Sequence, residues 1–317
     1  MNREQMIKLA NDRSFFLKVR NPDYLKGVRR FFQNLLGEDL GDGDITTNAV
    51  LKDGKTKAII VSNEPGVLAG GEEFRWLYRE NDVSVKPLKK DGEKFGRNET
   101  LFEIEGPKKL IFYLERTGLN ILQRMSGVAT ETREMVDRVR RTNYNLAIAG
   151  TRKTHWGYLD KKAVTIGGGF SHRLGLWESF LIKDNHLDSL RKQGVRNPIE
   201  FAIEKAWESR KKSVFIEVEV KNPKEAMEAA GKYRELQTES KETKPCIIML
   251  DNIKPEDIKK IVQELKENDL YDHVLLEASG GVTKEDILEY ARAGVDVCSL
   301  GCLTHSTKAI DISQKVF

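Results

Sequence analysis

Three cysteines are few for a chain of 317 residues, and their spacing excludes both a disulfide framework and a cysteine-based metal site. Cys246 and Cys298 fall within apolar runs, so we interpret them as small core residues of a protein from a reducing compartment. Long apolar runs are also missing, since no stretch approaches the roughly 20 residues that a membrane span requires. The first residues do not resemble a signal peptide either, so we expect a cytoplasmic protein without membrane association.

An excess of one charge sign is also absent. The chain has 53 Lys and Arg against 49 Asp and Glu, a formal net charge of only +4. Opposite charges alternate along most of the chain, as in residues 224–228, which is typical of solvated helix faces. Because no basic stripe interleaved with aromatic residues is present, we predict no nucleic-acid partner. The 39% hydrophobic and 32% charged residues indicate a globular protein of one large domain or two ordinary ones.

The predicted elements change in kind near residue 106. Before it, residues 1–36 show a helical pattern interrupted at Asn21-Pro22, and short strands are predicted at 57–62, 66–69, 83–87 and 100–104. We expect a small, mostly antiparallel sheet packed on N-terminal helices. A long helix is predicted from about residue 109 to 141, and we place a domain boundary inside it.

Strands and helices then alternate to the end of the chain. Buried strands are predicted at 146–149, 163–166, 180–182, 214–220, 246–250, 273–277 and 295–300, and three of the intervening helices begin near Pro198, Pro223 and Pro255. This alternation predicts a parallel sheet with right-handed crossovers. A barrel is favoured because polar residues recur just after the strands and would meet at one mouth. An open doubly wound sheet is the alternative, although no dinucleotide-type glycine motif opens it.

Five cationic or imidazole side chains follow the first three of these strands. They are Arg152, Lys153, His172, Arg173 and Lys183. Strand ends of a barrel bring such residues together, so we predict a site for carboxylates or phosphate, with Arg offering a bidentate fork. Some of them could instead be ordinary ion-pair partners on the rim.

Carboxylates and glycines occupy the later strand ends. Glu217 and Glu219 share one face of a strand, while Asp251 and Glu277 end the next two apolar runs. Such groups could coordinate Mg²⁺ or hold ribose hydroxyls, or could pair with the cations. The glycine-containing segments 278–281 and 299–301 follow the last two strands, where backbone N–H groups commonly bind phosphate. The glycine run 167–169 could serve only close backbone packing.

Ten ordered motifs resemble the quinolinate phosphoribosyltransferase family over nearly the whole chain. They are residues 38–47 (EDLGDGDITT), 66–70 (GVLAG), 115–127 (ERTGLNILQRMSG), 151–154 (TRKT), 172–173 (HR), 181–186 (LIKDNH), 217–220 (EVEV), 250–252 (LDN), 277–281 (EASGG) and 303–306 (LTHS). The resemblance implies an incomplete α/β barrel at residues 119–303 and a smaller N-terminal α/β sandwich domain at 1–118, joined by 304–317. It also implies phosphoribosyl transfer from phosphoribosyl pyrophosphate to quinolinate with decarboxylation, giving nicotinate mononucleotide for NAD biosynthesis.

The same resemblance assigns roles to particular residues. Lys153, Lys183, Glu219 and Asp251 are implied to be catalytic, with Glu219 and Asp251 as Mg²⁺ ligands. The implied substrate-binding residues are Arg116, Arg152, Lys153, His172, Arg173, Lys183, Glu219, Asp251, Glu277, Ser279, Gly280, Gly301 and His305. The family pattern further implies a homodimer, or a higher oligomer, in which Arg116 reaches the partner's site. The role of Glu217 stays open between ligand and structural partner.

Several positions depart from the family pattern. Gly150 replaces an Asp, His155-Trp156-Gly157 replaces an apolar-Pro-Gly segment, Ser171 replaces Asn, and Glu178 stands near a usual Asp. These changes lie on the predicted pyridine side. They motivate an alternative function, phosphoribosyl transfer involving another heteroaromatic acid. A catalytically inactive homologue is the third alternative, which the retained charged residues and glycines disfavour.

Overall fold

The protein is described by a computed structural model that covers all residues from 1 to 317, and its chain forms two compact units. The barrel unit comprises Met1–Arg13, Met135–Lys153 and Phe170–Cys302, and the sandwich unit comprises Ser14–Glu134, Thr154–Gly169 and Leu303–Phe317. The predicted domain limits differ from these units. Residues 1–13 lie in the barrel unit, whereas residues 119–134 and 154–169 lie in the sandwich unit.

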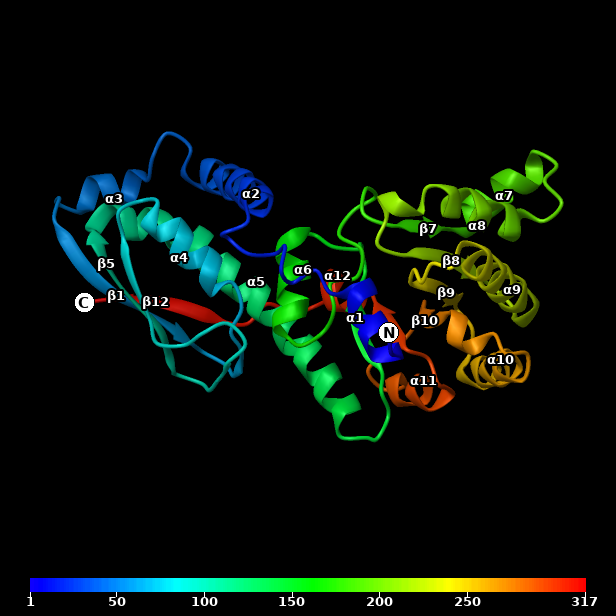
Figure 1. The fold of residues 1–317 in the computed structure, drawn as a ribbon. Helices are drawn as coiled ribbons and strands as arrows, with labels where there is room; N and C mark the ends of the chain where they lie inside the picture. Colours follow the sequence, from blue (N-terminus) through cyan, green and yellow to red (C-terminus); the bar gives the residue numbers. More distant parts are fainter. The chain divides into compact units, whose positions relative to one another are not determined.

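The barrel unit contains one parallel six-stranded sheet, as predicted. Its elements are α1 (Arg3–Asn11), β6 (Ala147–Gly150), β7 (Phe180–Ile182), α7 (Asp184–Lys192), α8 (Pro198–Glu208), η1 (Arg210–Lys212), β8 (Ile216–Val220), α9 (Pro223–Ser240), β9 (Cys246–Asp251), α10 (Pro255–Glu267), η2 (Tyr271–His273), β10 (Leu275–Ser279), α11 (Ile287–Ala293) and β11 (Val297–Leu300). Helices α8, α9 and α10 each begin with Pro, whose fixed φ suits the first helical turn. Figure 1 shows α7 to α10 along one side of strands β7 to β10.

The strand order identifies an incomplete barrel. The sheet runs β6-β11-β10-β9-β8-β7, so strands β7 to β11 pair in chain order and β11 pairs back to β6. On its other side β6 makes a single parallel bridge, from Ala149 to Phe170. The pairings leave an open seam between Phe170 and β7. A doubly wound sheet would reverse its strand order in the middle, so this alternative is wrong.

One predicted strand is helical. Residues 163–166 form the last turn of α6 (Tyr158–Ile166) in the sandwich unit. Leu159, Ala163 and Val164 are all buried there, at helical spacing. A short apolar run does not distinguish a buried strand from one face of a helix, and here the helical contacts decide. His172 and Arg173 therefore follow the bridge at Phe170 rather than a strand at 163–166.

The sandwich unit contains the predicted antiparallel sheet, in the order β12-β1-β5-β3, and a small two-stranded sheet of β2 and β4. Its elements are α2 (Pro22–Leu40), α3 (Ile45–Val50), β1 (Lys55–Ser62), β2 (Gly66–Val67), α4 (Gly71–Arg79), β3 (Ser84–Pro87), β4 (Lys94–Phe95), β5 (Thr100–Pro107), most of α5 (Lys108–Arg140), α6, most of α12 (Cys302–His305) and β12 (Ile312–Val316). Alternate residues of β5 are buried against α4, where the rings of Phe74 and Phe102 lie 5.0 Å apart.

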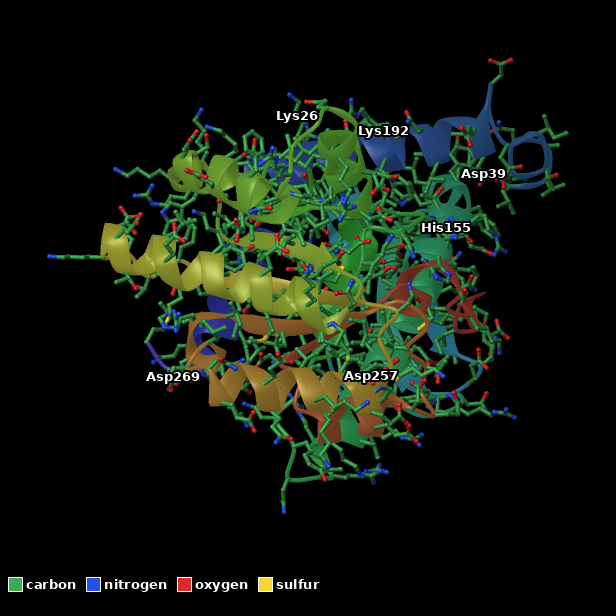
Figure 2. The ribbon with its side chains drawn as sticks, turned by 90° about the vertical axis from the view of Figure 1, so that its right-hand side faces the viewer. Lys26, Asp39, His155, Lys192, Asp257 and Asp269 are labelled. Carbon is green, nitrogen blue, oxygen red and sulfur yellow. The ribbon has the colours of Figure 1, made fainter.

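Charged side chains on the outer helices of the barrel unit lie in solvent. Figure 2 shows Asp257 in the first turn of α10 and Asp269 just beyond its last turn. Asp257 forms an exposed i,i+3 ion pair with Lys260 at 2.7 Å. Such exposed pairs contribute little to stability. No helix of the structure has the length and apolar character needed to cross a membrane.

A buried charged cluster in the sandwich unit gives the first testable prediction. Lys162 pairs with Glu72 and Glu73, and Asp91 accepts the N–H groups of Gly71 and Glu72 at the start of α4. Burial, reinforced by the charge of Glu73, raises the pKa of Asp91 to about 6. The folded state therefore holds this proton more tightly than the unfolded chain does. The resulting stabilisation is full below the unfolded pKa, near 4, and is lost as the pH rises through 6.

We expect the Asp91→Asn variant to remove this dependence. Between pH 5 and pH 7 the unfolding free energy of the unmodified protein should fall by roughly 1.3 kcal/mol more than that of the variant. Chemical denaturation of both proteins at the two pH values measures the difference. Parallel pH profiles for the two proteins would show that Asp91 titrates normally.

Candidate active site

A cavity of about 330 Å³ lies at the carboxyl ends of the barrel strands. It is lined by Thr151, Arg152, Lys153, His172, Arg173, Leu181, Lys183, Glu219, Met249, Asp251, Glu277, Ser279 and Ser299. Parallel strands place these residues together because their ends meet at one rim. Lys183 follows β7 directly, Asp251 ends β9, and Ser279 ends β10.

Most predicted site residues line this cavity. The nine are Arg152, Lys153, His172, Arg173, Lys183, Glu219, Asp251, Glu277 and Ser279. The prediction did not include Thr151, Leu181, Met249 and Ser299. Leu181 and Met249 stand two residues before Lys183 and Asp251 on their strands, so the strand period of two could have placed them on the same face.

His172 is held in a strained conformation at the cavity wall. Its φ of 51° lies in the left-handed region, which costs a non-glycine residue roughly 1–3 kcal/mol unless the surroundings fix it. Its backbone N–H donates to the carbonyl oxygen of Asn11 at 2.9 Å. Its Nε2 lies 2.9 Å from Oε2 of Glu277 and 3.5 Å from Oε2 of Glu217. Contacts to the backbone N–H and to the imidazole ring therefore both hold His172 in place.

Glu217 lies beneath the cavity rather than in its lining. The side chain is fully buried, and neither carboxylate oxygen has a hydrogen-bond partner. Burial and the nearby Glu277 raise its pKa well above its usual range. The neutral form of Glu217 is therefore favoured, and Glu277 makes the shorter of the two contacts with His172. Glu217 lies 3.5 Å from Nε2 of His172 and outside the cavity lining, and its role stays open between ligand and structural partner.

Arg173 offers an unused donor in a buried place. The residue is only 6% exposed, and its Nη1 donates to the carbonyl oxygen of Ser179 at 3.1 Å. Its Nε is buried and has no hydrogen-bond partner. Burial, reinforced by the charge of Arg152, lowers the pKa of Arg173, so the positive charge of the guanidinium is disfavoured at this position. A bound carboxylate would satisfy the free donor and relieve the repulsion between the two cations.

Glu219 and Asp251 form the acidic side of the cavity. Burial raises the pKa of Glu219, and the charges of Asp251 and Asp184 raise it further, while Lys183 and Lys221 oppose them. Oxygen ligands that repel each other in this way suit a divalent cation such as Mg²⁺. These two residues therefore fit the predicted metal, and Lys183 brings a positive charge close to them.

Gly280 allows two loops to approach closely at the cavity mouth. Its φ is +86°, and an added Cβ would lie 2.4 Å from Oδ1 of Asn252. The backbone N–H of Asn252 donates to the carbonyl oxygen of Ser279 at 2.9 Å, which joins the loops after β9 and β10. Only glycine fits this position without a shift of the loop after β9. Gly301, which follows β11, is half-buried.

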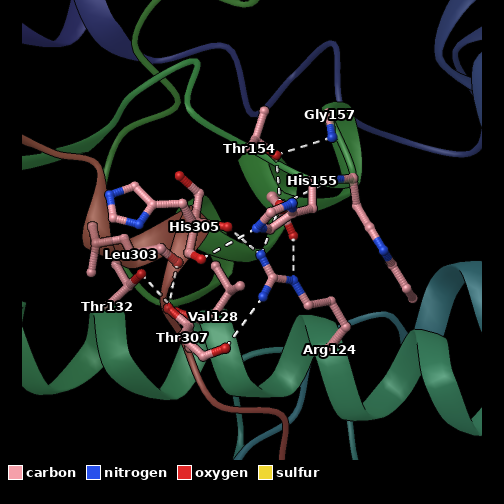
Figure 3. Close-up of polar contacts among 12 residues, drawn as sticks. Arg124, Val128, Thr132, Thr154, His155, Gly157, Leu303, His305 and Thr307 are labelled. Carbon is pink, nitrogen blue, oxygen red and sulfur yellow. Dashed lines mark hydrogen bonds and ion pairs between the residues drawn. The ribbon is translucent and has the colours of Figure 1, made fainter.

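Arg116 and His305 belong to the sandwich unit, and both side chains are exposed. Arg116 lies on α5, and His305 ends α12. Figure 3 shows the carbonyl oxygen of His305 beside the ring of His155, with an Nε2–O distance of 3.2 Å. The structure assigns neither Arg116 nor His305 to the cavity lining, and their roles stay predictions.

The segment that departs most from the family pattern is anchored within the sandwich unit. Asp160 is buried and pairs with Arg124 through two contacts of 3.0 Å. It also accepts the Thr154 hydroxyl at 2.5 Å and the Trp156 N–H at 3.1 Å. Figure 3 shows Arg124 reaching this segment from α5. The network explains how the segment at residues 154–160 is held, and neither His155 nor Trp156 lines the cavity.

The incomplete barrel and its cavity define a class, namely an α/β-barrel protein that receives an anionic ligand between cations and carboxylates. Family models named quinolinate phosphoribosyl transferase match the chain at residues 44–126 (N-terminal domain) and 128–315 (C-terminal domain). The chain belongs to the quinolinate phosphoribosyltransferase family.

Known proteins of this family resemble the chain over most of its length. A probable carboxylating nicotinate-nucleotide pyrophosphorylase of Methanothermobacter thermautotrophicus is 37% identical over 287 residues, covering 90% of this chain and 97% of that protein. A decarboxylating quinolinate phosphoribosyltransferase of Nicotiana tabacum is 36% identical over 331 residues, covering 98% and 88%. The solved nicotinate-nucleotide pyrophosphorylase of Francisella tularensis has a TM-score of 0.78 and 32% identity, covering 92% and 96%.

Proposed function

We propose that this protein is a carboxylating nicotinate-nucleotide pyrophosphorylase. It transfers the phosphoribosyl group of phosphoribosyl pyrophosphate to quinolinate and releases CO₂ and pyrophosphate, giving nicotinate mononucleotide for NAD biosynthesis. The observation that carries the proposal within this family is the buried, unpartnered Nε of Arg173 in a cavity that combines cations with carboxylates. The cations of that cavity suit the carboxylates of a dicarboxylate. Its acidic residues suit the ribose hydroxyls or the metal ion of a sugar phosphate.

The cations bind and orient quinolinate. Arg152, His172 and Arg173 hold its two adjacent carboxylates, and the ring nitrogen then faces the donor. The nitrogen attacks C1 of the ribose as pyrophosphate leaves. Quaternisation of the nitrogen eases loss of CO₂ from the neighbouring carbon, because the carbanion forms beside a positive charge. Lys153 and Lys183 add preorganised positive charge at this step, and the carbon then takes up a proton.

The other side of the cavity holds the donor. Glu219 and Asp251 would hold Mg²⁺, and the ion would supply positive charge against the negative charge of the pyrophosphate group. Glu277, Ser279, Gly280 and Gly301 bind the phosphoribosyl part, and the family resemblance assigns His305 to its phosphate. In a homodimer, or a higher oligomer, Arg116 completes the partner's quinolinate pocket. We place this activity in the cytoplasm.

The positions that depart from the family pattern do not favour another acceptor. Ser171 and Glu178, like His155 and Trp156, are absent from the cavity lining. The side chains of Ser171 and Glu178 are bound to residues at the end of α1 instead. A changed acceptor would require changed cavity residues, so quinolinate is the acceptor that the lining supports best.

Mass spectrometry tests the function. Purified protein with quinolinate, phosphoribosyl pyrophosphate and Mg²⁺ should yield nicotinate mononucleotide at about 1 per second or not far below. A panel of other pyridine and heteroaromatic acids serves as the comparison. A better acceptor in that panel would favour the alternative transferase, and binding of both substrates without turnover would favour an inactive homologue.

A further inference from the structure

Helix α1 packs against the barrel unit to which it belongs. Ile7 and Ala10 form one buried cluster with strand residues that lie mostly at the amino-terminal ends of their strands, namely Ala149, Phe215, Ile247, Leu275 and Val297. Figure 1 shows the helix beside β10 and α11. The first residues of the chain are therefore part of the barrel core.

The end of α1 fastens the segment that carries His172 and Arg173. On the amino-terminal side of this pair, the carbonyl oxygen of Asn11 accepts the His172 N–H at 2.9 Å and the Ser171 hydroxyl at 3.1 Å. The backbone N–H of Arg13 donates to Oγ of Ser171 at 2.9 Å. Three hydrogen bonds thus hold the backbone that enters the cavity wall.

The carboxyl-terminal side of the pair is held by the Arg13 side chain. Its Nε forms an ion pair with Oε1 of Glu178, and Oε2 of Glu178 accepts the N–H of Leu174 at 2.7 Å. The next residue, Ser179, supplies the carbonyl oxygen that receives Nη1 of Arg173. Arg13 therefore contacts the chain on both the amino-terminal and the carboxyl-terminal side of Arg173. Arg13 itself is absent from the cavity lining.

Arg13 is itself rigidly placed. Its Nη1 donates to the carbonyl oxygens of Leu9 and Asp12 at 3.0 and 2.6 Å, and its Nη2 donates to that of Ala10 at 2.8 Å. These carbonyls lie in and just after the last turn of α1 and lack helical partners, so the guanidinium caps the helix while it binds Glu178. Arg13 therefore links the end of the helix to the segment 171–178.

We propose that Arg13 is a positioning residue that sets the affinity for the aromatic dicarboxylate by holding His172 and Arg173 through Ser171 and Glu178. This inference rests on the proposed function, in which His172 and Arg173 bind the quinolinate carboxylates. Ser171 and Glu178, two of the positions that depart from the family pattern, then act together with Arg13 to hold His172 and Arg173.

The test compares two arginines at opposite ends of α1, Arg3 in its first turn and Arg13 just beyond its last turn. Arg13→Met should raise the KM for quinolinate about 10- to 100-fold and leave the KM for phosphoribosyl pyrophosphate nearly unchanged, because small displacements of binding groups are costly. Arg3→Met is the matched control. Arg3 pairs with Asp296 through contacts of 2.6 and 2.7 Å at the other end of α1, away from residues 171–178. It should lower stability without changing either KM, and Arg13→Lys should restore part of the quinolinate affinity.

Equal effects of Arg13→Met and Arg3→Met on both KM values would overturn the proposal, since α1 would then act only through stability. If Arg13→Met does not fold, Ser171→Ala decides. A rise of about threefold or more in the KM for quinolinate supports positioning, and an unchanged KM refutes it.

Failure of the proposed function has a separate signature. If the unmodified protein makes no nicotinate mononucleotide, calorimetric binding of phthalate, a benzene ring with two adjacent carboxylates, replaces the assay. Weaker phthalate binding in Arg13→Met but not in Arg3→Met would support positioning even though the assigned reaction is wrong. No phthalate binding by the unmodified protein would overturn both.

Discussion

Replacement of Arg173 by alanine should raise the KM for quinolinate about 100-fold and change the KM for phosphoribosyl pyrophosphate far less. Arg173 is buried, its Nε lacks a partner, and its Nη1 is already oriented by Ser179. A charge-assisted, forked contact with a carboxylate contributes about 1.5–3 kcal/mol, which corresponds to about a 10- to 150-fold change in affinity. Steady-state kinetics with each substrate varied in turn measures the effect.

Two further variants separate charge from geometry. Arg173→Lys keeps a positive charge but loses the planar fork, so its KM for quinolinate should lie between those of the unmodified protein and the alanine variant. Arg191→Ala removes an exposed arginine of α7 that pairs with Asp188 at 2.6 Å, and it should change neither KM. Equal increases in both KM values for Arg173→Ala would contradict the assignment of Arg173 to the quinolinate side.

Replacement of Glu219 by glutamine should lower kcat about 100-fold or more and shift the Mg²⁺ dependence to higher concentrations. Burial raises the pKa of Glu219, and the charge of Asp251 raises it further, so a nearby cation would stabilise the ionised form. Glutamine keeps the shape and one oxygen ligand but removes the charge that would attract the metal. Titration of activity with Mg²⁺ after removal of metal with a chelator measures both effects.

Asp251→Asn should act in the same direction, and the double variant should be no worse than the sum of the two free-energy changes because the two side chains are close enough to couple. Asp257→Asn provides the control, since Asp257 pairs only with surface groups on α10. A Glu219→Gln enzyme with an unchanged Mg²⁺ dependence would remove Glu219 from the metal site.

Sequence alone could predict the strand-end residues because each stands in a local pattern. Lys183 and Asp251 follow short apolar runs that can only be strands in an alternating chain, and parallel strands must present their ends together. Residues 163–166 show the limit of the same argument. Their apolar run belongs to a helix. The prediction that His172 and Arg173 follow a strand at 163–166 is therefore wrong in its reasoning, although both residues belong to the site.

Sequence could not predict the support behind these residues. Arg13 and Glu178 are separated by 165 positions, and neither stands in a motif that points to the other. The amphipathic pattern of α1 indicates that one face is buried but not which strands cover it. For the same reason the predicted N-terminal domain included residues 1–13, which the structure places in the barrel unit. Long-range packing decides which unit a segment such as residues 1–13 joins, and the local sequence pattern does not indicate that packing.

Each of the two units combines segments that lie far apart along the chain, which affects how they fold during synthesis. The barrel unit contains both α1 and β11, which are separated by most of the described residues. The sandwich unit likewise pairs β1 with β12 at the extreme C-terminus. Domains of nascent chains commonly fold one after another from the N-terminus. Here each unit combines segments from distant parts of the chain, so a break between α5 and β6 would leave neither fragment with a complete copy of either fold.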